Sequence, residues 1–581
     1  MTARIGFAVA VTTAALAFAP ASAFAQGPFG PLNDLAALGQ GFGDSPDTVP
    51  VQRPPAPPMD AVPRANCGPG SKREPSIQGR VPAGSATDGL WCNVEMLSHQ
   101  GTSGGFKVQR YVDAAGHECA YYDTALLFPA NAFNLNSSGV GVAVLDMSNP
   151  RKPVQTDTLT EPPMLSPHES VLLNQKRGLL AAVDGNPGTY PGMVSIYDVS
   201  KDCRQPVHDY TGLLAKLGHE SGFSMDGKTF YATGTAYKMI TAIDVTDPKA
   251  PHVVWQGNIV SHGMSLSDDG NRAYVADPTD HNMLILDTSQ IQARKPDPTA
   301  KEISRITWDR ASIPQNAIPF TRDGHPYVLE FDEYNEGTLN PSGNPDNVGA
   351  GRIIDIANEK SPRIVSNLRL QINQPKEHAE YGGDPGADGS THGGAQGYAA
   401  HYCNIPTRVD PKIVACSFIA SGLRLFDISD LEHPKEVGYF VAPTQTRFEN
   451  GGEASDFAMS EPAFVPARHE IWFTDGTSGF YALRVTNGAW PGATSAVRGT
   501  CTTAKRKTYT LKLPRHANAR RVRASLGKKR VRITRVKRSR GKVRVTVNAR
   551  GLKPGKLRFR VRLTNGKTVK RSRTFKGCPA H

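Results

Sequence analysis

The stretch Ala242-Ile243-Asp244-Val245-Thr246-Asp247-Pro248 contains the pattern that decides the fold of this chain. An apolar strand ends in Asp, and an apolar residue, Ser or Thr, and often Pro follow it. Because the Asp carboxylate accepts backbone N–H groups and Pro fixes φ, the pattern predicts a strand that ends in a tight turn. The aspartates of five further copies are Asp146, Asp198, Asp287, Asp355 and Asp427.

The copies recur at the spacing of a four-stranded propeller blade. Successive aspartates lie 52, 46, 43, 68 and 72 residues apart, and the longer intervals indicate enlarged loops. A second pattern, a short strand, an Asp-Gly turn and another apolar strand, precedes several copies. We predict an all-β chain with a seven-bladed β-propeller, while six or eight blades remain compatible. The blades are expected near residues 93–160, 168–210, 219–256, 262–307, 315–369, 398–442 and 461–486.

The last expected blade contains only three strands. We expect a fourth strand from the start of the ring, over Ile77 to Val81, to complete it. Such closure removes the exposed sheet edges that would otherwise favour aggregation.

The apolar–apolar–Asp–apolar–Ser–Asp–Pro copies resemble the LVIVD-repeat family of exported bacterial propellers. The resemblance covers residues 90–486 and rests on six copies. It implies the propeller architecture, and it implies no particular chemistry because the family is defined by blade structure.

The N-terminus has the order of a secretory signal peptide. Arg4 precedes an apolar run, and Ala23-Phe24-Ala25 forms a small-x-small cleavage site, so residues 1–25 are the predicted signal peptide. Residues 26–66 are rich in Pro, Gly and Ala and are expected to form a flexible leader. We assign the propeller to residues 67–500 and predict a secreted or cell-surface monomer without a transmembrane segment.

The charge of the chain is divided unevenly. Residues 502–581 contain 29 of the 67 Lys and Arg residues and none of the 53 acidic residues, so the remainder is acidic. Aliphatic and basic residues alternate along this tail, as in Lys542-Val543-Arg544-Val545, which predicts strands with one buried face. We therefore expect residues 501–578 to form a small basic β-sandwich that resembles appended immunoglobulin-like domains.

Three explanations of this charge are open: a solvated face that blocks edge pairing, attraction to the acidic propeller, or adhesion to a polyanion. The polyanion could be a cell-envelope polymer, an anionic lipid or exogenous nucleic acid, and the expected partner of residues 502–581 is an anionic cell-envelope polymer. Specific nucleic-acid recognition is disfavoured because aromatic residues for base stacking are scarce.

Eight cysteines fit an oxidising compartment. Cys403 with Cys416 and Cys501 with Cys578 are predicted disulfides. Cys92 with Cys119 is a third suggestion, and it would leave Cys67 and Cys203.

Four histidines stand at the start of expected inner strands: His168, His219, His262 and His401. Inner strands line the channel of a propeller, so these imidazoles are candidate ligands of a copper, zinc or iron ion. The alternatives are a polar ligand pocket or hydrogen bonds that lock neighbouring blades together. Glu169, Glu220, Gln315 and Glu461 are further polar candidates for the channel.

Other catalytic motifs are absent from the sequence, including a nucleophile elbow, a phosphate-binding Gly-rich loop and a dinucleotide fingerprint. The sequence favours a non-catalytic binding protein. Its propeller would recognise a protein or small molecule, and its basic domain would tether it to an anionic polymer. The alternative is a metal-dependent extracytoplasmic enzyme centred on the four histidines, and a purely structural surface protein is a third option.

Overall fold

The computed structural model describes residues 48–124, 140–185, 192–234, 239–335, 344, 346–381, 397–446, 454–492, 506–527, 529–549, 552 and 555–575. The chain divides into two compact units, Met1–Pro491 and Gly492–His581. The predicted signal peptide, Cys501 and Cys578 lie outside the described residues. No helix within the described ranges is long and apolar enough to span a membrane.

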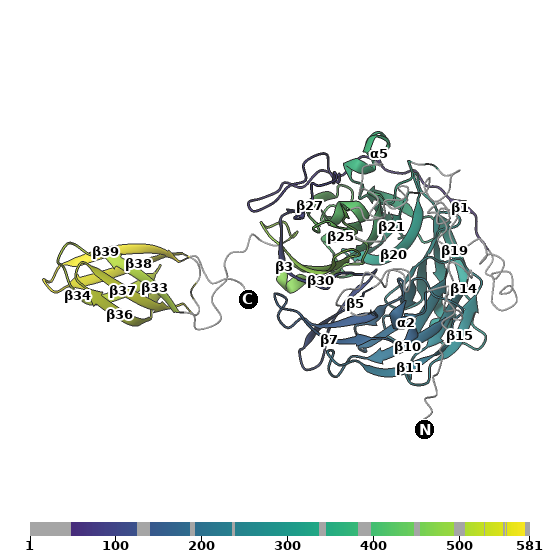
Figure 1. Ribbon diagram of the computed structural model, residues 1–581, viewed down its shortest axis with the longest axis horizontal. Coiled ribbons are helices and arrows are strands. Elements are labelled where there is room, and N and C mark those ends of the chain that lie inside the picture. Colours follow the sequence, from purple (N-terminus) through teal and green to yellow (C-terminus); the bar gives the residue numbers. More distant parts are fainter. Residues whose placement is uncertain are drawn as a thin grey trace, which may run out of the picture. The chain divides into compact units, whose positions relative to one another are not determined.

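The first unit is a β-propeller (Figure 1). Its described residues form seven sheets of four or five strands, each containing a four-stranded antiparallel blade, and consecutive blades surround a central axis. The inner strands of the first six blades contact one another in turn, and the inner strand of the last blade contacts that of the first.

The first four blades, inner strand first, contain β4 (Val108–Val112), β5 (Glu118–Asp123), β6 (Val142–Asp146) and β7 (Val154–Leu159); β8 (Leu172–Asn174), β9 (Leu179–Val183), β10 (Met193–Asp198) and β11 (Val207–Leu213); β12 (Ser221–Phe223), β13 (Thr229–Gly234), β14 (Met239–Asp244) and β15 (His252–Gly257); and β16 (Met264–Leu266), β17 (Arg272–Asp277), β18 (Asn282–Asp287) and β19 (Lys301–Ile306).

The last three blades contain β20 (Ile313–Arg322), β21 (His325–Glu333), β22 (Gly351–Asp355) and β23 (Arg363–Asn367); β24 (Ala400–Asn404), β25 (Ile413–Phe418), β26 (Gly422–Asp427) and β27 (Lys435–Val441); and β30 (Ala463–Val465), β31 (Glu470–Asp475), β32 (Gly479–Val485) and β3 (Val94–Gln100). The remaining elements of this unit are β1 (Val51–Gln52), β2 (Leu90–Cys92), β28 (Gln445–Thr446), β29 (Ala454–Ser455), α2 (Pro162–Leu165), α3 (Ser289–Gln292), α5 (Pro375–Tyr381), and the 3₁₀ turns η5 (Gln371–Asn373), η6 (Ile419–Ser421) and η8 (Pro466–Arg468).

The repeated aspartates end the third strand of their blades, as the sequence pattern predicts. Each accepts a hydrogen bond from the backbone N–H two residues further on, at 2.7–3.0 Å. The carboxylate thereby satisfies a donor that has left the strand ladder, which explains why the position requires Asp.

The strand that closes the ring differs from the prediction. Ile77 to Val81 forms no strand. The fourth strand of the last blade is β3, which pairs antiparallel with β32 from Val94↔Val485 to Gln100↔Phe480. Since β3 directly precedes β4 in the chain, the N-terminal segment passes from the outer edge of the last blade into the inner strand of the first.

Residues 48–66, assigned to the leader, contact the propeller. β1 adds to β19 as a parallel strand. The Val62 N–H donates to the carbonyl of Arg369, and the Ala65 N–H donates to the carboxylate of Glu436.

Three disulfides join described residues. Cys403–Cys416 is confirmed, whereas the suggested Cys92–Cys119 pair is wrong: Cys92 bonds to Cys67, and Cys119 bonds to Cys203. Cys92 lies on β2 and Cys119 on β5, which belong to different sheets.

The second unit consists of two antiparallel sheets, in keeping with the predicted sandwich. Aliphatic residues of both sheets, with Phe559 and Phe575, form its core, and the alternating basic residues lie outside. One sheet contains β33 (Arg506–Lys512), β37 (Lys542–Asn548) and β36 (Ile533–Ser539). The other contains β35 (Lys529–Val531), β34 (Ala519–Leu526), β38 (Gly555–Leu563) and β39 (Thr568–Phe575).

Candidate functional site

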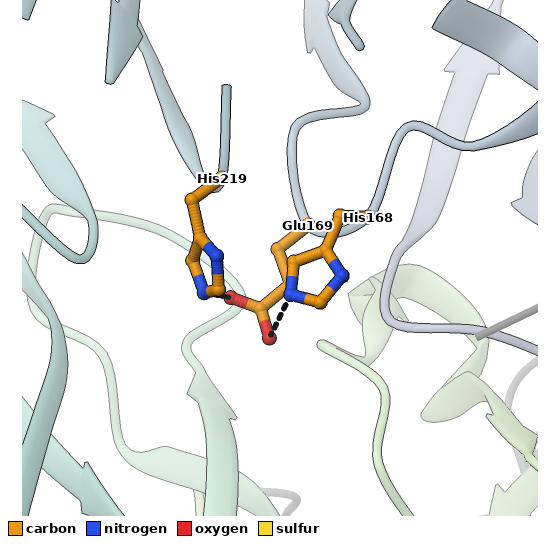
Figure 2. Close-up of side chains that lie close together, drawn as sticks. All are labelled: His168, Glu169 and His219. Carbon is orange, nitrogen blue, oxygen red and sulfur yellow. Dashed lines mark ion pairs between the residues drawn. The ribbon is translucent and has the colours of Figure 1, made fainter. Parts of the chain in front are cut away.

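The candidate site is built where the inner strands begin. His168 and Glu169 precede β8, His219 precedes β12, His262 precedes β16, and His401 lies on β24. Consecutive residues of an extended strand point in opposite directions. His168 instead has φ of 51°, in the left-handed region. This conformation breaks the alternation, and His168 and Glu169 both point toward the space that His219 enters from the next blade (Figure 2).

All four predicted histidines converge on the carboxylate of Glu169. The Nε2 atoms of His219 and His401 both lie 3.2 Å from a Glu169 oxygen, and those of His168 and His262 lie 3.9 and 4.0 Å away. The rings of His168 and His219 are 4.2 Å apart, and those of His219 and His262 are 4.5 Å apart. Imidazoles from four blades therefore surround one point.

A second carboxylate, Glu333 at the end of β21, completes the cluster. Its oxygens lie 2.8 Å from Nε2 of His401 and 3.4 Å from Nε2 of His262. Two overlapping sets have ligand atoms that all lie within 4.8 Å of one another: His168, Glu169 and His219, and Glu169, Glu333 and His401.

Backbone hydrogen bonds turn Nε2 of two imidazoles inward. Nδ1 of His262 lies 2.8 Å from the carbonyl of Pro314, and Nδ1 of His401 lies 2.6 Å from that of Met459. A carbonyl only accepts, so in each ring Nδ1 carries a proton, and Nε2 of the neutral ring presents a lone pair. Pro314 lies on β20 and Met459 shortly before β30, each in the next blade, so these histidines also link neighbouring blades.

Neighbouring polar groups hold Glu169 in place. The Tyr402 hydroxyl donates to Oε2 of Glu169 at 3.0 Å, and the Gln315 side-chain amide donates to the same oxygen. The side chains of Glu169 and Glu333 are 2% and 5% exposed. Several buried polar atoms lack hydrogen-bond geometry to any described group: Nε2 of His219, Nε2 of His401, Nδ1 of His168 and Oε2 of Glu333.

The pKa values divide the imidazoles into two pairs. Burial, reinforced by His219, lowers the pKa of His168 to about 3, and burial lowers that of His262 to about 4. Burial also disfavours the charged form of the other two. For His401, Glu333 and Glu169 outweigh it and raise the pKa to about 10, and for His219 the carboxylate of Glu169 raises the pKa. At neutral pH His168 and His262 are therefore neutral, and His401 is protonated against Glu333 and Glu169, while the Glu169 carboxylate shifts the pKa of His219 upward.

A second polar cluster lies beside the first. The fully buried Lys107 ammonium lies 2.6 Å from Glu220 and 2.7 Å from Glu461, and 3.9 Å from the ring centroid of Tyr402. Burial raises the pKa of Glu220 to about 7, although Lys107 acts against this rise. A cavity of about 550 Å³ adjoins this cluster, and its lining includes Glu220, Glu461 and the inner strands β8, β12 and β16.

The structure thus separates the predicted polar residues. Glu169 and Gln315 join the histidines, whereas Glu220 and Glu461 bind Lys107. The sequence interpretation missed Glu333 and Lys107. Lys107 precedes β4 as Glu169 precedes β8, so the register of the inner strands is the signal that would have located it. Glu333 ends β21, the second strand of its blade, whereas the repeated Asp marks only the end of the third strand.

No family model matches the chain, so the LVIVD resemblance stays a prediction. No curated protein matches it either.

Similar solved structures include a periplasmic gluconolactonase from Pseudomonas aeruginosa, hydrazine synthase from Kuenenia stuttgartiensis and a protein from Lactobacillus plantarum. Their identities to this chain are 14%, 14% and 13%, with TM-scores of 0.41, 0.41 and 0.40. The matches cover 59%, 67% and 62% of this chain and 87%, 97% and 89% of the other proteins. Likenesses at this level give no information about activity.

Proposed function

We propose that this chain is a metal-dependent oxidoreductase of an oxidising, extracytoplasmic compartment, with its metal held at the axis of the propeller. The observation that carries the proposal is the convergence of four Nε2 atoms within 4.0 Å of the Glu169 carboxylate. Of the three functions expected from the sequence, neither the recognition platform nor the structural role has comparable support among the described residues.

The electrostatics of the cluster favour a bound cation. Nε2 of neutral His262 and the oxygens of Glu333 and Glu169 all present lone pairs, yet they lie 3.4 and 4.0 Å apart. A cation among these atoms relieves the repulsion between their lone pairs: protonated His401 does so for Glu333 and Glu169, and a metal ion would also engage Nε2 of His262. Oε2 of Glu333, together with Nε2 of His219 and Nε2 of His401, also lacks hydrogen-bond geometry to the described groups.

The donor set fits a transition metal. Imidazole suits iron, copper and zinc, and two imidazoles with one carboxylate, as in His168, Glu169 and His219, form the set typical of non-haem iron(II) oxygenases. When bound, such a metal supplies an electrophilic and redox-active centre. The imidazoles of His262 and His401 would surround the metal from the remaining sides. Iron is favoured over copper and zinc because a carboxylate is central to the set.

The surrounding residues orient the ligands and control access. Tyr402 and Gln315 fix the Glu169 carboxylate, and Phe106 packs its ring 4.8 Å from that of His168 and 5.4 Å from that of His401. The side chains of His168 and His219 are 13% and 18% exposed, whereas His401 is fully buried. A small substrate would therefore approach from the side of His168 and His219.

Extracytoplasmic action is supported by the three disulfides and by the predicted signal peptide at residues 1–25. Disulfides persist in oxidising compartments and are rare in the cytosol.

Metal analysis tests the proposal. The exported full-length protein is purified without an affinity metal, reconstituted separately with Fe(II), Cu(II) and Zn(II), and analysed by elemental analysis and calorimetry. We expect about one equivalent of metal, and at least a ~100-fold weaker affinity in the His219→Ala/His262→Ala variant. His433→Ala, at a site whose side chain is 79% exposed, is the control and should bind normally.

Failure of the wild-type protein to bind any of the three metals would overturn the proposal. Tight binding of zinc alone would exclude redox chemistry and leave a hydrolase as the matching activity.

A further inference from the structure

One face of the second unit carries a concentration of basic side chains that the stability of its fold does not require. The outward positions of the β35-β34-β38-β39 sheet hold eight basic side chains, all exposed. They are Arg521, Arg523, Arg530, Lys556, Arg558, Arg560, Arg562 and Lys570. We call this set the basic face.

The register of the sheet places like charges directly opposite one another. Arg523 pairs with Arg560, which in turn pairs with Lys570, and Arg521 pairs with Arg562. Directly opposed like charges destabilise an antiparallel sheet. Residues 502–581 contain no acidic residue that could compensate, and the described part of this unit forms no ion pair within 4.0 Å. The protein therefore keeps an arrangement that costs stability.

Other arginines of the same unit have structural partners. Arg538 donates to the carbonyl of Ala519 at 2.9 Å, Arg571 to that of Lys512 at 2.8 Å, and Arg573 to that of Thr510 at 3.0 Å. These three bridge the two sheets at their edges. The side chains of the basic face make no such bond in the described structure, so a structural role does not account for them.

We propose that the basic face binds a linear phosphate-bearing polymer of the cell envelope. Neighbouring strands lie about 4.8 Å apart, and alternate residues on one strand about 6.7 Å apart, so the cations form a regular array. Six of the eight are arginines, whose planar guanidinium groups bind phosphate oxygens in pairs. This binding is independent of the metal centre proposed above.

Two other anionic partners fit the face less well. An interfacial membrane protein inserts exposed apolar side chains, and every large exposed apolar residue of the described chain precedes residue 410. Single-stranded nucleic acid is held by base stacking, but Phe559 and Phe575 are buried and Tyr509 is half-buried.

The test uses the full-length protein and inorganic polyphosphate as the probe, with binding followed by fluorescence anisotropy at about 0.15 M salt, where the screening length is about 8 Å. The test variant is Arg523→Ser/Arg560→Ser/Lys570→Ser, which removes one row of the basic face. The matched control, Arg535→Ser/Lys537→Ser/Arg544→Ser, removes the same charge from exposed positions of the other sheet.

We expect the test variant to bind at least ~20-fold more weakly, with the slope of log affinity against log salt reduced by about 2. The control should lose less than ~3-fold. Circular dichroism should show both variants folded, and the test variant should be no less stable than wild type, since it relieves the opposed charges.

Equal losses in both variants would show attraction by net charge alone and overturn the assignment to this face. Absence of polyphosphate binding, or tighter binding to phosphatidylglycerol vesicles or single-stranded DNA, would overturn the polymer as the partner.

Discussion

Replacement of Lys107 by Met should destabilise the propeller more than removal of any surface cation. The Lys107 ammonium is fully buried and lies 2.6 Å from Glu220 and 2.7 Å from Glu461, whose side chains are 1% and 17% exposed. Methionine preserves the volume and removes the charge, so two carboxylates lose their cation in a low-dielectric channel. Breaking a buried ion pair from one side costs about 3–5 kcal/mol, and we expect a loss of that size.

The matched control is Arg151→Met. Arg151 lies 2.6 Å from Glu95, the same separation as in the buried pair, but these side chains are 50% and 46% exposed. Exposed pairs contribute about 0–1 kcal/mol, so the two variants separate burial from distance. Urea unfolding followed by tryptophan fluorescence provides the measurement, because all five tryptophans lie between residues 91 and 490. The signal therefore reports the first unit alone.

The loss should depend on pH. The pKa of Glu220 is already raised to about 7 by burial, against the opposing effect of Lys107, and it should rise further without the lysine. A carboxyl whose folded-state pKa lies above its unfolded value loses stability as pH rises between the two values. The deficit of Lys107→Met should therefore be smaller at about pH 5.5 than at about pH 8.

A second substitution tests the cause. Lys107→Met/Glu220→Gln should recover at least about 1 kcal/mol, because one of the two unpaired carboxylates is then neutral. A loss below about 1 kcal/mol in Lys107→Met, or the same loss at both pH values, would refute the reasoning.

Three further predictions concern the frame of the propeller. Joint replacement of Cys119 and Cys203, which are 84 residues apart, should lower the free energy of unfolding by about 4–5 kcal/mol. The same change at Cys403 and Cys416, which are 13 residues apart, should lower it by about 3 kcal/mol. Equal losses in urea unfolding would contradict the loop-entropy argument. Gly263→Ala should cost about 1–3 kcal/mol, since the new Cβ would lie 1.8 Å from Oε2 of Glu220, and an unchanged melting temperature would show that the channel accommodates it. Arg424→Met should cost about 3–5 kcal/mol, because fully buried Glu436 loses its cation and Glu74 keeps only the half-exposed Arg64. Near-wild-type unfolding would show that these carboxyls are neutral in the native state.

The local features of the fold could be predicted from the sequence because their causes are local. The Asp-ended strands depend on contacts two residues apart. The separation of an acidic body from a basic tail depends on composition alone. The same locality identified His168, His219, His262 and His401, since each opens an inner strand.

The ring closure, the disulfide pairing and the full composition of the site depend on residues far apart in the sequence. Glu333 reaches His401 because β21 extends to the same end of the channel, and Cys119 meets Cys203 because adjacent blades bring them together. The closing strand Val94–Gln100 is defined by its pairing with residues almost 400 positions away. The sequence by itself therefore determined the repeated blade and the position of the histidines within it. Only the closed ring determined which side chains meet at the axis of the propeller. The cluster there is assembled by contacts between blades, so no repeated sequence pattern within a single blade reveals it.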